Sequence, residues 1–152
     1  MIATAQSIEN LTLNLMQEIR VHAPVEVSFA ALLEQLGPAH DTIDGKLMPM
    51  KIEAWPGGRW HRDLGDGNGH FWGHVQAIKR PTLLEIAGPL FMSDPVISNV
   101  QYRLSEQNGE TLIAFQHTAL GLIQDEYREG MERGWTHIHS RVRERAEANH
   151  PR

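Results

Sequence analysis

The 152-residue chain contains no cysteine, no long apolar run and no block of basic residues. Without cysteine, disulfides, thiolate catalysis and thiolate metal sites are excluded. No apolar stretch approaches the roughly 18 residues that a membrane-spanning helix needs. The N-terminus also lacks the charged-then-apolar pattern of a secretion signal. We therefore expect a cytoplasmic protein that does not enter a membrane.

The charge balance also excludes a class of partner. The chain has 14 Lys and Arg against 19 Asp and Glu, a formal net charge of −5. Nucleic-acid binders usually carry a basic patch, so nucleic acid is not expected as a partner. Hydrophobic residues make up 41%, close to the globular average. The length suits one domain, expected over residues 1–152 with a flexible segment at 1–8, as a monomer or a homodimer.

Hydrophobic periodicity predicts the order of elements. Apolar side chains at alternate positions predict a half-buried strand over residues 11–21. Helical spacing after Pro24 predicts a short helix that ends near Gly37. Breaks rich in proline or glycine then separate four segments of strand length. These strands are predicted at residues 48–55, 59–64, 70–79 and 82–88.

The clearest hairpin is centred on Asn108-Gly109, a dipeptide that supplies the positive φ angles of a type I′ turn. It joins predicted strands at 98–107 and 110–119. A two-residue loop fixes the register, which pairs Leu104 with Ile113, Tyr102 with Phe115, and Val100 with His117. One face of the hairpin is then almost wholly apolar, and a slip of one residue would mix the two faces. His117 is therefore expected to point inward.

The last predicted helix covers residues 124–149. It carries one apolar stripe, formed by Tyr127, Met131, Trp135, Ile138 and Val142. Gly130 and Gly134 lie one above the other, and each costs about 1 kcal/mol relative to alanine in a helix interior. Two explanations stay open. The commoner one is close packing of the sheet against the helix, and the other is space left for a ligand.

The predicted order is strand, helix, antiparallel strands and long helix, which indicates an α+β fold. Several segments then resemble the START-like (SRPBCC, birch-pollen-allergen-like) superfamily, in the branch related to the C-terminal domain of the heat-shock protein 90 ATPase activator. They are residues 19–29 with their Ala23-Pro24 helix entry, Trp55-Pro56-Gly57-Gly58-Arg59-Trp60, residues 73–78, Pro81-Thr82-Leu83-Leu84, residues 109–112, His117 and Gly134-Trp135. Residues 37–42 depart from it, because family members often carry a tryptophan-containing stretch after the first helix.

The resemblance implies a helix-grip fold, a curved antiparallel sheet around the C-terminal helix with a cavity between them. Members of the superfamily include lipid carriers, hormone receptors, aromatic polyketide cyclases and co-chaperones. We therefore expect a small hydrophobic or aromatic molecule to bind in that cavity, without being transformed. The alternatives are a co-chaperone-like module that binds a chaperone partner, and a polyketide cyclase or hydrolase with His117 as general base.

The residues expected to line the ligand site are Trp60, Trp72, His74, Tyr102, Phe115, His117, Met131 and Trp135. His117 has two readings, a polar group for the ligand or a buried histidine hydrogen-bonded to backbone or Tyr102. No catalytic triad, nucleophile elbow or phosphate loop is present in the sequence, so an enzyme is not favoured.

The nine histidines invite a test for a metal site. His137 and His139 point apart on a helix. His70 and His74 lie about 13 Å apart along a strand, too far to share an ion. No metal and no cofactor are predicted.

One hairpin leaves its orientation open. The strands at 59–64 and 70–79 are joined by the turn-forming segment 65–69. This loop would place Trp60 near His74 and Arg62 near Trp72, so that the guanidinium could stack on the indole. The two tryptophans would share one face, but the opposite face is also apolar, and the pattern does not decide which face is buried.

Overall fold

The computed structural model describes residues 7–150, and residues 1–6 of the predicted flexible segment lie outside that range. Ile8, the last residue of that segment, begins a short 3₁₀ helix. The elements in chain order are η1 (Ile8–Leu11), β1 (Thr12–Val21), α1 (Val25–Leu36), β2 (Lys51–Ile52), β3 (Arg59–Gly65), β4 (Asn68–Lys79), β5 (Leu83–Gly88), β6 (Val96–Gln107), β7 (Glu110–Gly121) and α2 (Asp125–Ala148). No helix within the described range is long and apolar enough to cross a membrane.

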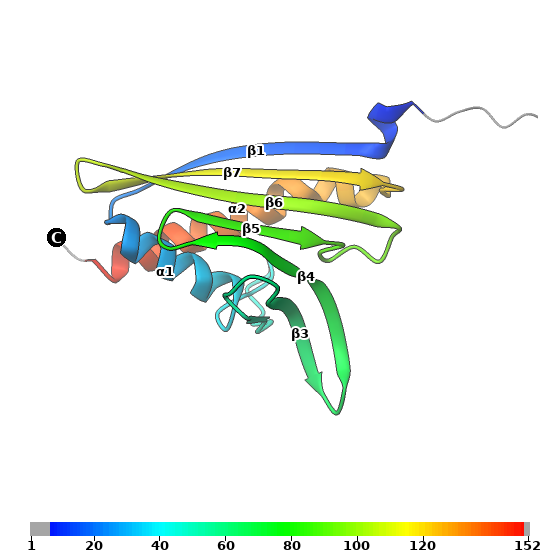
Figure 1. Cartoon of the computed structure of the whole chain (residues 1–152), viewed down its shortest axis with the longest axis horizontal. Coiled ribbons are helices and arrows are strands. Elements are labelled where there is room, and N and C mark those ends of the chain that lie inside the picture. Colours follow the sequence, from blue (N-terminus) through cyan, green and yellow to red (C-terminus); the bar gives the residue numbers. More distant parts are fainter. Residues whose placement is uncertain (1–6, 151–152) are drawn as a thin grey trace, which may run out of the picture.

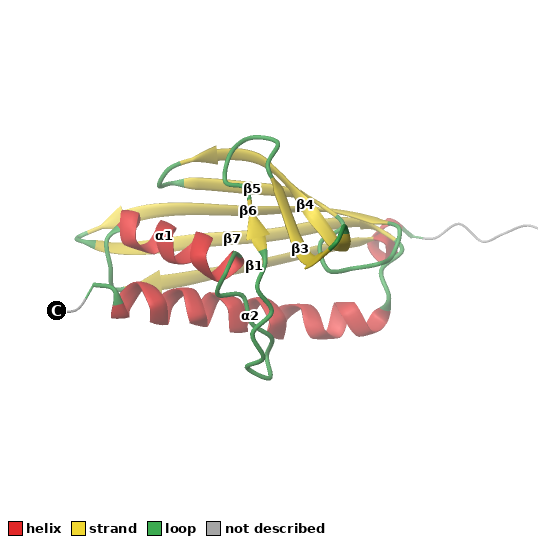
Figure 2. Cartoon of the chain, turned by 90° about the horizontal axis from the view of Figure 1, so that it is seen from below, coloured by secondary structure: helices red, strands yellow, loops and turns green. Residues whose placement is uncertain are grey.

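The seven described strands form one antiparallel sheet in the order β1-β7-β6-β5-β4-β3-β2. The sheet curves along its length, and the β3–β4 hairpin bends away from the long strands (Figure 1). Both α1 and α2 cover the same face of the sheet, with α2 running along it beside β1 (Figure 2). This arrangement is the predicted α+β helix-grip fold. The uncovered face is open to solvent, which suits an antiparallel sheet with alternating polarity.

The β6–β7 hairpin confirms the predicted register. Leu104 pairs with Ile113, Tyr102 with Phe115, and Val100 with His117. The turn has φ of 56° at Asn108 and 80° at Gly109, as a type I′ turn requires. His117 is accordingly buried on the apolar face.

The register predicted for β3 and β4 is wrong. Arg62 pairs with His70 rather than with Trp72, and Trp60 pairs with Gly73 rather than with His74. The strands continue to a tight turn at Asp66-Gly67, where both φ angles are positive. A register shift follows Trp60, so that β4 carries an extra residue at this point.

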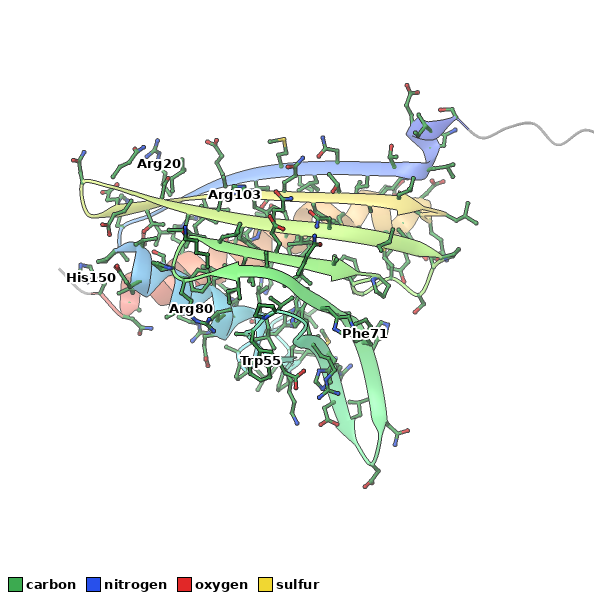
Figure 3. All side chains as sticks on the ribbon, in the orientation of Figure 1. Arg20, Trp55, Phe71, Arg80, Arg103 and His150 are labelled. Carbon is green, nitrogen blue, oxygen red and sulfur yellow. The ribbon has the colours of Figure 1, made fainter. Side chains whose placement is uncertain are left out.

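That bulge also settles which face of β4 is buried. Trp72 and Val75 are both buried although they are three residues apart, which strict alternation forbids. Strand β5 approaches β4 closely at Gly73, where a Cβ would lie 2.8 Å from the Ala87 carbonyl oxygen. Trp60 and Trp72 are therefore both buried, and His74 is exposed. Phe71 of β4 is exposed as well (Figure 3).

The strand predicted at 48–55 shrinks to the two residues of β2. The reason lies in the preceding loop, because the amides of Met48 and Met50 donate to the carbonyls of His40 and Gly37 instead of to a neighbouring strand. The segment that follows α1 is thus folded back on itself.

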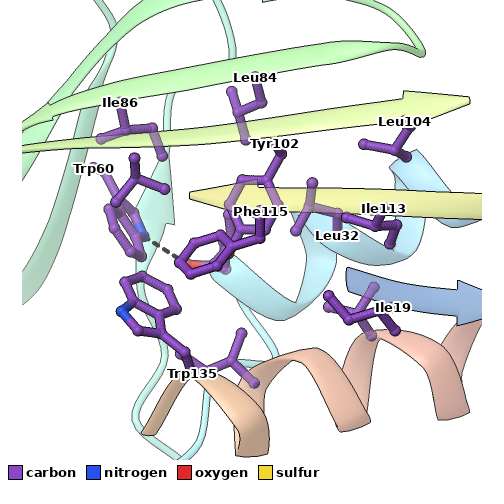
Figure 4. Close-up of a cluster of buried hydrophobic side chains, with 14 of the residues drawn as sticks. Ile19, Leu32, Trp60, Leu84, Ile86, Tyr102, Leu104, Ile113, Phe115 and Trp135 are labelled. Carbon is purple, nitrogen blue, oxygen red and sulfur yellow. Dashed lines mark hydrogen bonds between the residues drawn. The ribbon is translucent and has the colours of Figure 1, made fainter. Parts of the chain in front are cut away.

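The core fills the space between the sheet and the two helices (Figure 4). Its largest fully buried side chains include Trp60, Tyr102, Phe115 and Trp135. The Trp60 indole donates a 2.8 Å hydrogen bond to the Leu36 carbonyl, which anchors β3 to the end of α1. A buried indole normally finds such a partner, because its N–H is costly to leave unpaired.

Candidate functional site

A cleft of about 450 Å³ lies on the flank of the last helix. Its walls come from four parts of the chain that are far apart in sequence: the first half of α2, the segment after α1, β4, and the connection between β5 and β6. Most of its surface is apolar. Both its size and its lining are typical of sites for small molecules.

Aromatic rings form the inner wall of the cleft. Trp72 and Phe91 meet edge to face with centroids 5.7 Å apart. Phe91 in turn lies 6.3 Å from both Tyr127 and Trp135 of α2. These distances are within the range at which aromatic pairs attract. The wall therefore offers ring faces and edges from three elements to a molecule in the cleft.

Gly130 and Gly134 face this cleft. A Cβ added at either position would meet no atom within 4 Å, so the sheet does not approach the helix there. Close packing of the sheet, the commoner explanation considered from the sequence, is contradicted. The two glycines instead widen the cleft along one side of α2.

The rim of the cleft is formed by the segment 37–50, which includes residues 37–42, the stretch that the sequence marked as departing from the resemblance. Helix α1 ends at Gly37, whose amide donates to the carbonyls of Leu33 and Glu34. The segment then makes a tight turn in which Gly45 adopts φ of 80°. An isolated bridge between Asp41 and Leu47 closes the base of this turn.

Asp41 fastens the rim to α2. Its carboxylate accepts a 2.8 Å bond from His137 Nε2, and its other oxygen lies 3.4 Å from Arg141 Nε. Gln35 Nε2 also donates to Asp41 at 3.2 Å. Because both partners in the shortest contact are mostly buried, it is worth more than an exposed ion pair.

Beneath the cleft, Trp135 joins a buried hydrogen-bonded chain. Its Nε1 donates to His117 Nδ1 at 3.0 Å, and His117 Nε2 lies 2.9 Å from Ser98 Oγ. Since Nδ1 accepts, the proton of the neutral ring is on Nε2 and is donated to Ser98. Burial lowers the pKa of His117 to about 4. The imidazole is therefore neutral at neutral pH, with both nitrogens engaged.

A second buried chain surrounds His139. Its Nδ1 lies 2.7 Å from Gln17 Oε1, an atom that only accepts, so Nδ1 carries the proton. Nε2 then accepts the hydroxyl proton of Tyr102 at 2.9 Å. Burial lowers the pKa of His139 to about 3 and raises that of Tyr102. Both groups are thus held neutral in the core.

The structure brings together only part of the predicted site. Trp72, Met131 and Trp135 line the cleft, and Trp60 lies directly behind Trp72 with its ring centroid 4.9 Å away. Tyr102, Phe115 and His117 lie deeper, in the core beneath Trp135, and are not cleft residues. His74 is on the outer face of the sheet, where its ring contacts Phe71 and bonds the Gly57 carbonyl.

The expected partner of His117 is also different. The bond to Tyr102 considered from the sequence is made by His139, whereas His117 bonds Ser98 and Trp135. Because neither nitrogen of His117 is free, the geometry does not support this residue as a general base for a molecule in the cleft.

Sequence reasoning missed His40, Asp41, Phe91, Tyr127 and His137 as cleft residues. A signal for the first two existed, because they lie in the segment 37–42 that departs from the family pattern. Phe91 follows a Gly-Pro break and has no periodicity to mark it. Its role depends on where the β5–β6 connection folds.

The comparisons with known proteins agree with this architecture. The family model described as Activator of Hsp90 ATPase homolog 1-like protein matches residues 22–147. The chain belongs to this family. A search of curated proteins finds no match to it. Among residues 7–150, no group of three His, Asp or Glu side chains is placed to hold a metal ion.

Several solved structures share the fold of this chain. An uncharacterised protein from Rhizobium leguminosarum has a TM-score of 0.68 at 18% identity, over 90% of this chain and 95% of the other. Ara h 8.0201 has a TM-score of 0.67 at 14% identity, over 90% and 99%. The di-domain ARO/CYC StfQ from the steffimycin biosynthetic pathway has 0.65 at 10% identity, over 93% of this chain and 53% of that one. At these identities the fold alone is shared.

Proposed function

We propose that this protein binds a small apolar or aromatic molecule in the cleft beside α2, without necessarily transforming it. The observation that carries the proposal is the pair of glycines that face the cleft with nothing near their missing side chains. A glycine in a helix interior lowers stability relative to alanine. Two glycines on one face of α2 therefore indicate that the open space beside the helix serves a purpose that offsets this cost.

The aromatic wall supports the chemical class of the ligand. Trp72, Phe91, Tyr127 and Trp135 present apolar rings to a volume that accommodates a molecule of several fused rings. The two buried histidines of the core have both ring nitrogens hydrogen-bonded inside the protein. Neither of these two histidines therefore offers a free base to the ligand, so the general-base role considered for His117 is not supported.

The test is a screen of lipids, polyketides and fused-ring aromatics by thermal shift and native mass spectrometry. A compound present at one hundred times its Kd should add about 2.7 kcal/mol to the free energy of unfolding and appear as a 1:1 complex. Gly134→Leu should fold but lose the complex, because its side chain enters the cleft.

Arg133→Leu is the matched control, since it places the same side chain on an exposed position one residue away. It should bind as the unchanged protein does. The proposal fails if no compound of these classes binds, or if Gly134→Leu binds as well as Arg133→Leu.

Membership of the activator family favours a second candidate, a module that binds a chaperone through its surface. In that case the host chaperone should be retained by the immobilised protein, and its ATPase rate should change when the protein is added. Gly134→Leu separates the two candidates, because a surface-acting module should keep its effect when the cleft is filled.

A further inference from the structure

His40 is a buried polar side chain of the cleft whose ring nitrogens have no hydrogen-bonding partner of ordinary geometry among residues 7–150. It lines the cleft with 4% of its surface exposed, and neither ring nitrogen makes a hydrogen bond of ordinary geometry within the described residues. The other polar side chains near it on the cleft wall already have hydrogen-bonding partners. Asp41 and His137 bond each other, and His70 accepts the indole N–H of Trp72.

The ring of His40 is nevertheless held in place. It meets Trp72 edge to face with centroids 5.5 Å apart and planes at 87°. Its own backbone carbonyl accepts the Met48 amide at 2.8 Å, which fixes the main chain at this point of the rim. An imidazole that is positioned by packing but left without partners costs free energy in the unliganded protein. A ligand that supplies the missing bond would recover that cost.

The charge state of His40 limits what that ligand is. Burial lowers its pKa, an effect that the Met48 backbone and the Asp41 charge only partly offset. The neutral imidazole has one donor and one acceptor nitrogen, and a hydroxyl group can pair with either. Asp41 and Glu126 also lie on the cleft wall, which disfavours an anionic ligand.

We propose that the cleft selects a neutral aromatic molecule that carries a hydroxyl group, a phenol in the simplest case, and that this hydroxyl pairs with the ring of His40. The inference rests on the proposed function, because it names the ligand class of the same cleft. The rings of the molecule pack against Trp72 and Phe91. Both ring nitrogens of His40 are covered in the unliganded protein, so a wall side chain must move before the hydroxyl can reach them. We assign that movement to Met48, a flexible side chain on the same wall.

The experiment compares three probes of one size by isothermal titration calorimetry at pH 7.5. The probes are 2-naphthol, 2-methylnaphthalene and 2-naphthoate, which present a hydroxyl, a methyl and a carboxylate from the same ring. The unchanged protein should bind 2-naphthol about tenfold more tightly than 2-methylnaphthalene, as one net hydrogen bond in a buried site predicts. It should bind 2-naphthoate most weakly.

His40→Leu should abolish the preference by weakening 2-naphthol alone. His40→Gln keeps a donor and an acceptor and should retain part of it. His74→Leu makes the same change at an exposed histidine on the outer face of the sheet, away from the cleft, and should leave the preference intact. Melting temperatures of all variants confirm that they are folded, and the comparison of probes on the unchanged protein needs no variant.

The outcomes distinguish a failure of the His40 contact from a failure of ligand binding in the cleft. Equal affinity for 2-naphthol and 2-methylnaphthalene, tightest binding of 2-naphthoate, or loss of the preference in His74→Leu rather than His40→Leu would overturn the role of His40 while leaving ligand binding in place. If none of the three probes binds to the unchanged protein, the role of His40 and the aromatic ligand class are both wrong.

Discussion

Trp135 connects the cleft to the core that supports it. One edge of its indole borders the cleft, and the ring also packs on Phe115 with centroids 4.7 Å apart and stacks on His139 at 5.7 Å. Its N–H holds His117 in one tautomer. A single side chain thus contributes to the binding surface, to the packing of α2 on the sheet and to a buried hydrogen-bonded chain.

Replacing Trp135 by alanine should lower the free energy of unfolding by about 3 to 5 kcal/mol, because it removes a buried indole and leaves His117 Nδ1 unpaired. Trp135→Phe should cost less, since it retains most of the apolar surface. Urea denaturation followed by circular dichroism measures both. A loss below about 1 kcal/mol for Trp135→Ala would contradict the packing described for α2.

At the scale of elements, α2 serves two purposes along its length. Its apolar stripe of Met131, Trp135, Ile138 and Val142 is buried as predicted. The neighbouring stripe of Gly130 and Gly134 faces the cleft. The helix therefore anchors the sheet with one stripe and shapes the site with the next.

Gly130→Ala and Gly134→Ala should each raise the free energy of unfolding by about 0.5 to 1 kcal/mol, since both residues are helical and the new Cβ meets nothing. Chemical denaturation of the two variants provides the measurement. If either alanine destabilises the protein, then the space beside α2 is smaller than the structure indicates, and close packing of the sheet is restored as the explanation.

The β3–β4 hairpin is an element whose pairing could not be predicted from the sequence pattern. Trp60 and Trp72 share a face as expected, but the strands pair in a different register because one extra residue enters β4 at the bulge. Strand alternation assumes one residue opposite one residue, and a bulge breaks that assumption. The outer position of His74 follows from the same shift.

The core contains two buried neutral histidines, His117 and His139, and burial also lowers the pKa of His40 in the cleft wall, so the stability of the fold should depend on pH. Burial lowers the pKa of His117 to about 4 and that of His139 to about 3. The unfolded chain takes up a proton on each near pH 6.5, whereas the folded chain does so only below these values. Below pH 6.5 the unfolded state therefore binds more protons, and stability falls as the pH falls.

Between pH 7.5 and pH 5, each of the two histidines should reduce the free energy of unfolding by about 2 kcal/mol. Urea denaturation at these pH values tests this. The measurements stop at pH 5 so that Glu53 does not affect the comparison. The Arg59 guanidinium lowers the pKa of Glu53 to about 2, so this residue changes the free energy of unfolding only near and below its ordinary pKa of 4.5.

His139→Leu should remove the part of the pH dependence that His139 contributes, about 2 kcal/mol between pH 7.5 and pH 5, whatever its stability at pH 7.5. His74→Gln, at an exposed histidine of the outer face, should leave it unchanged. Equal stability of the unchanged protein at pH 7.5 and pH 5 would show that the two histidines are not buried in neutral form.

The sequence by itself determined most of the elements and the register of one hairpin, because these depend on local periodicity and turn chemistry. The Asn108-Gly109 turn set the register of β6 and β7, which placed His117 in the core, and the apolar stripe of α2 indicated which side of that helix packs on the sheet. The family and its fold followed from segments in a fixed order.

Only the tertiary structure decided where the cleft lies. Trp135 fills the space above Tyr102 and Phe115, so the open volume moves to the flank of α2, where His40 and Phe91 come from connections that carry no periodic signal. Such residues are brought together by the path of loops and the bulge of one strand. Those depend on contacts between distant parts of the chain, and no local pattern of residues encodes them.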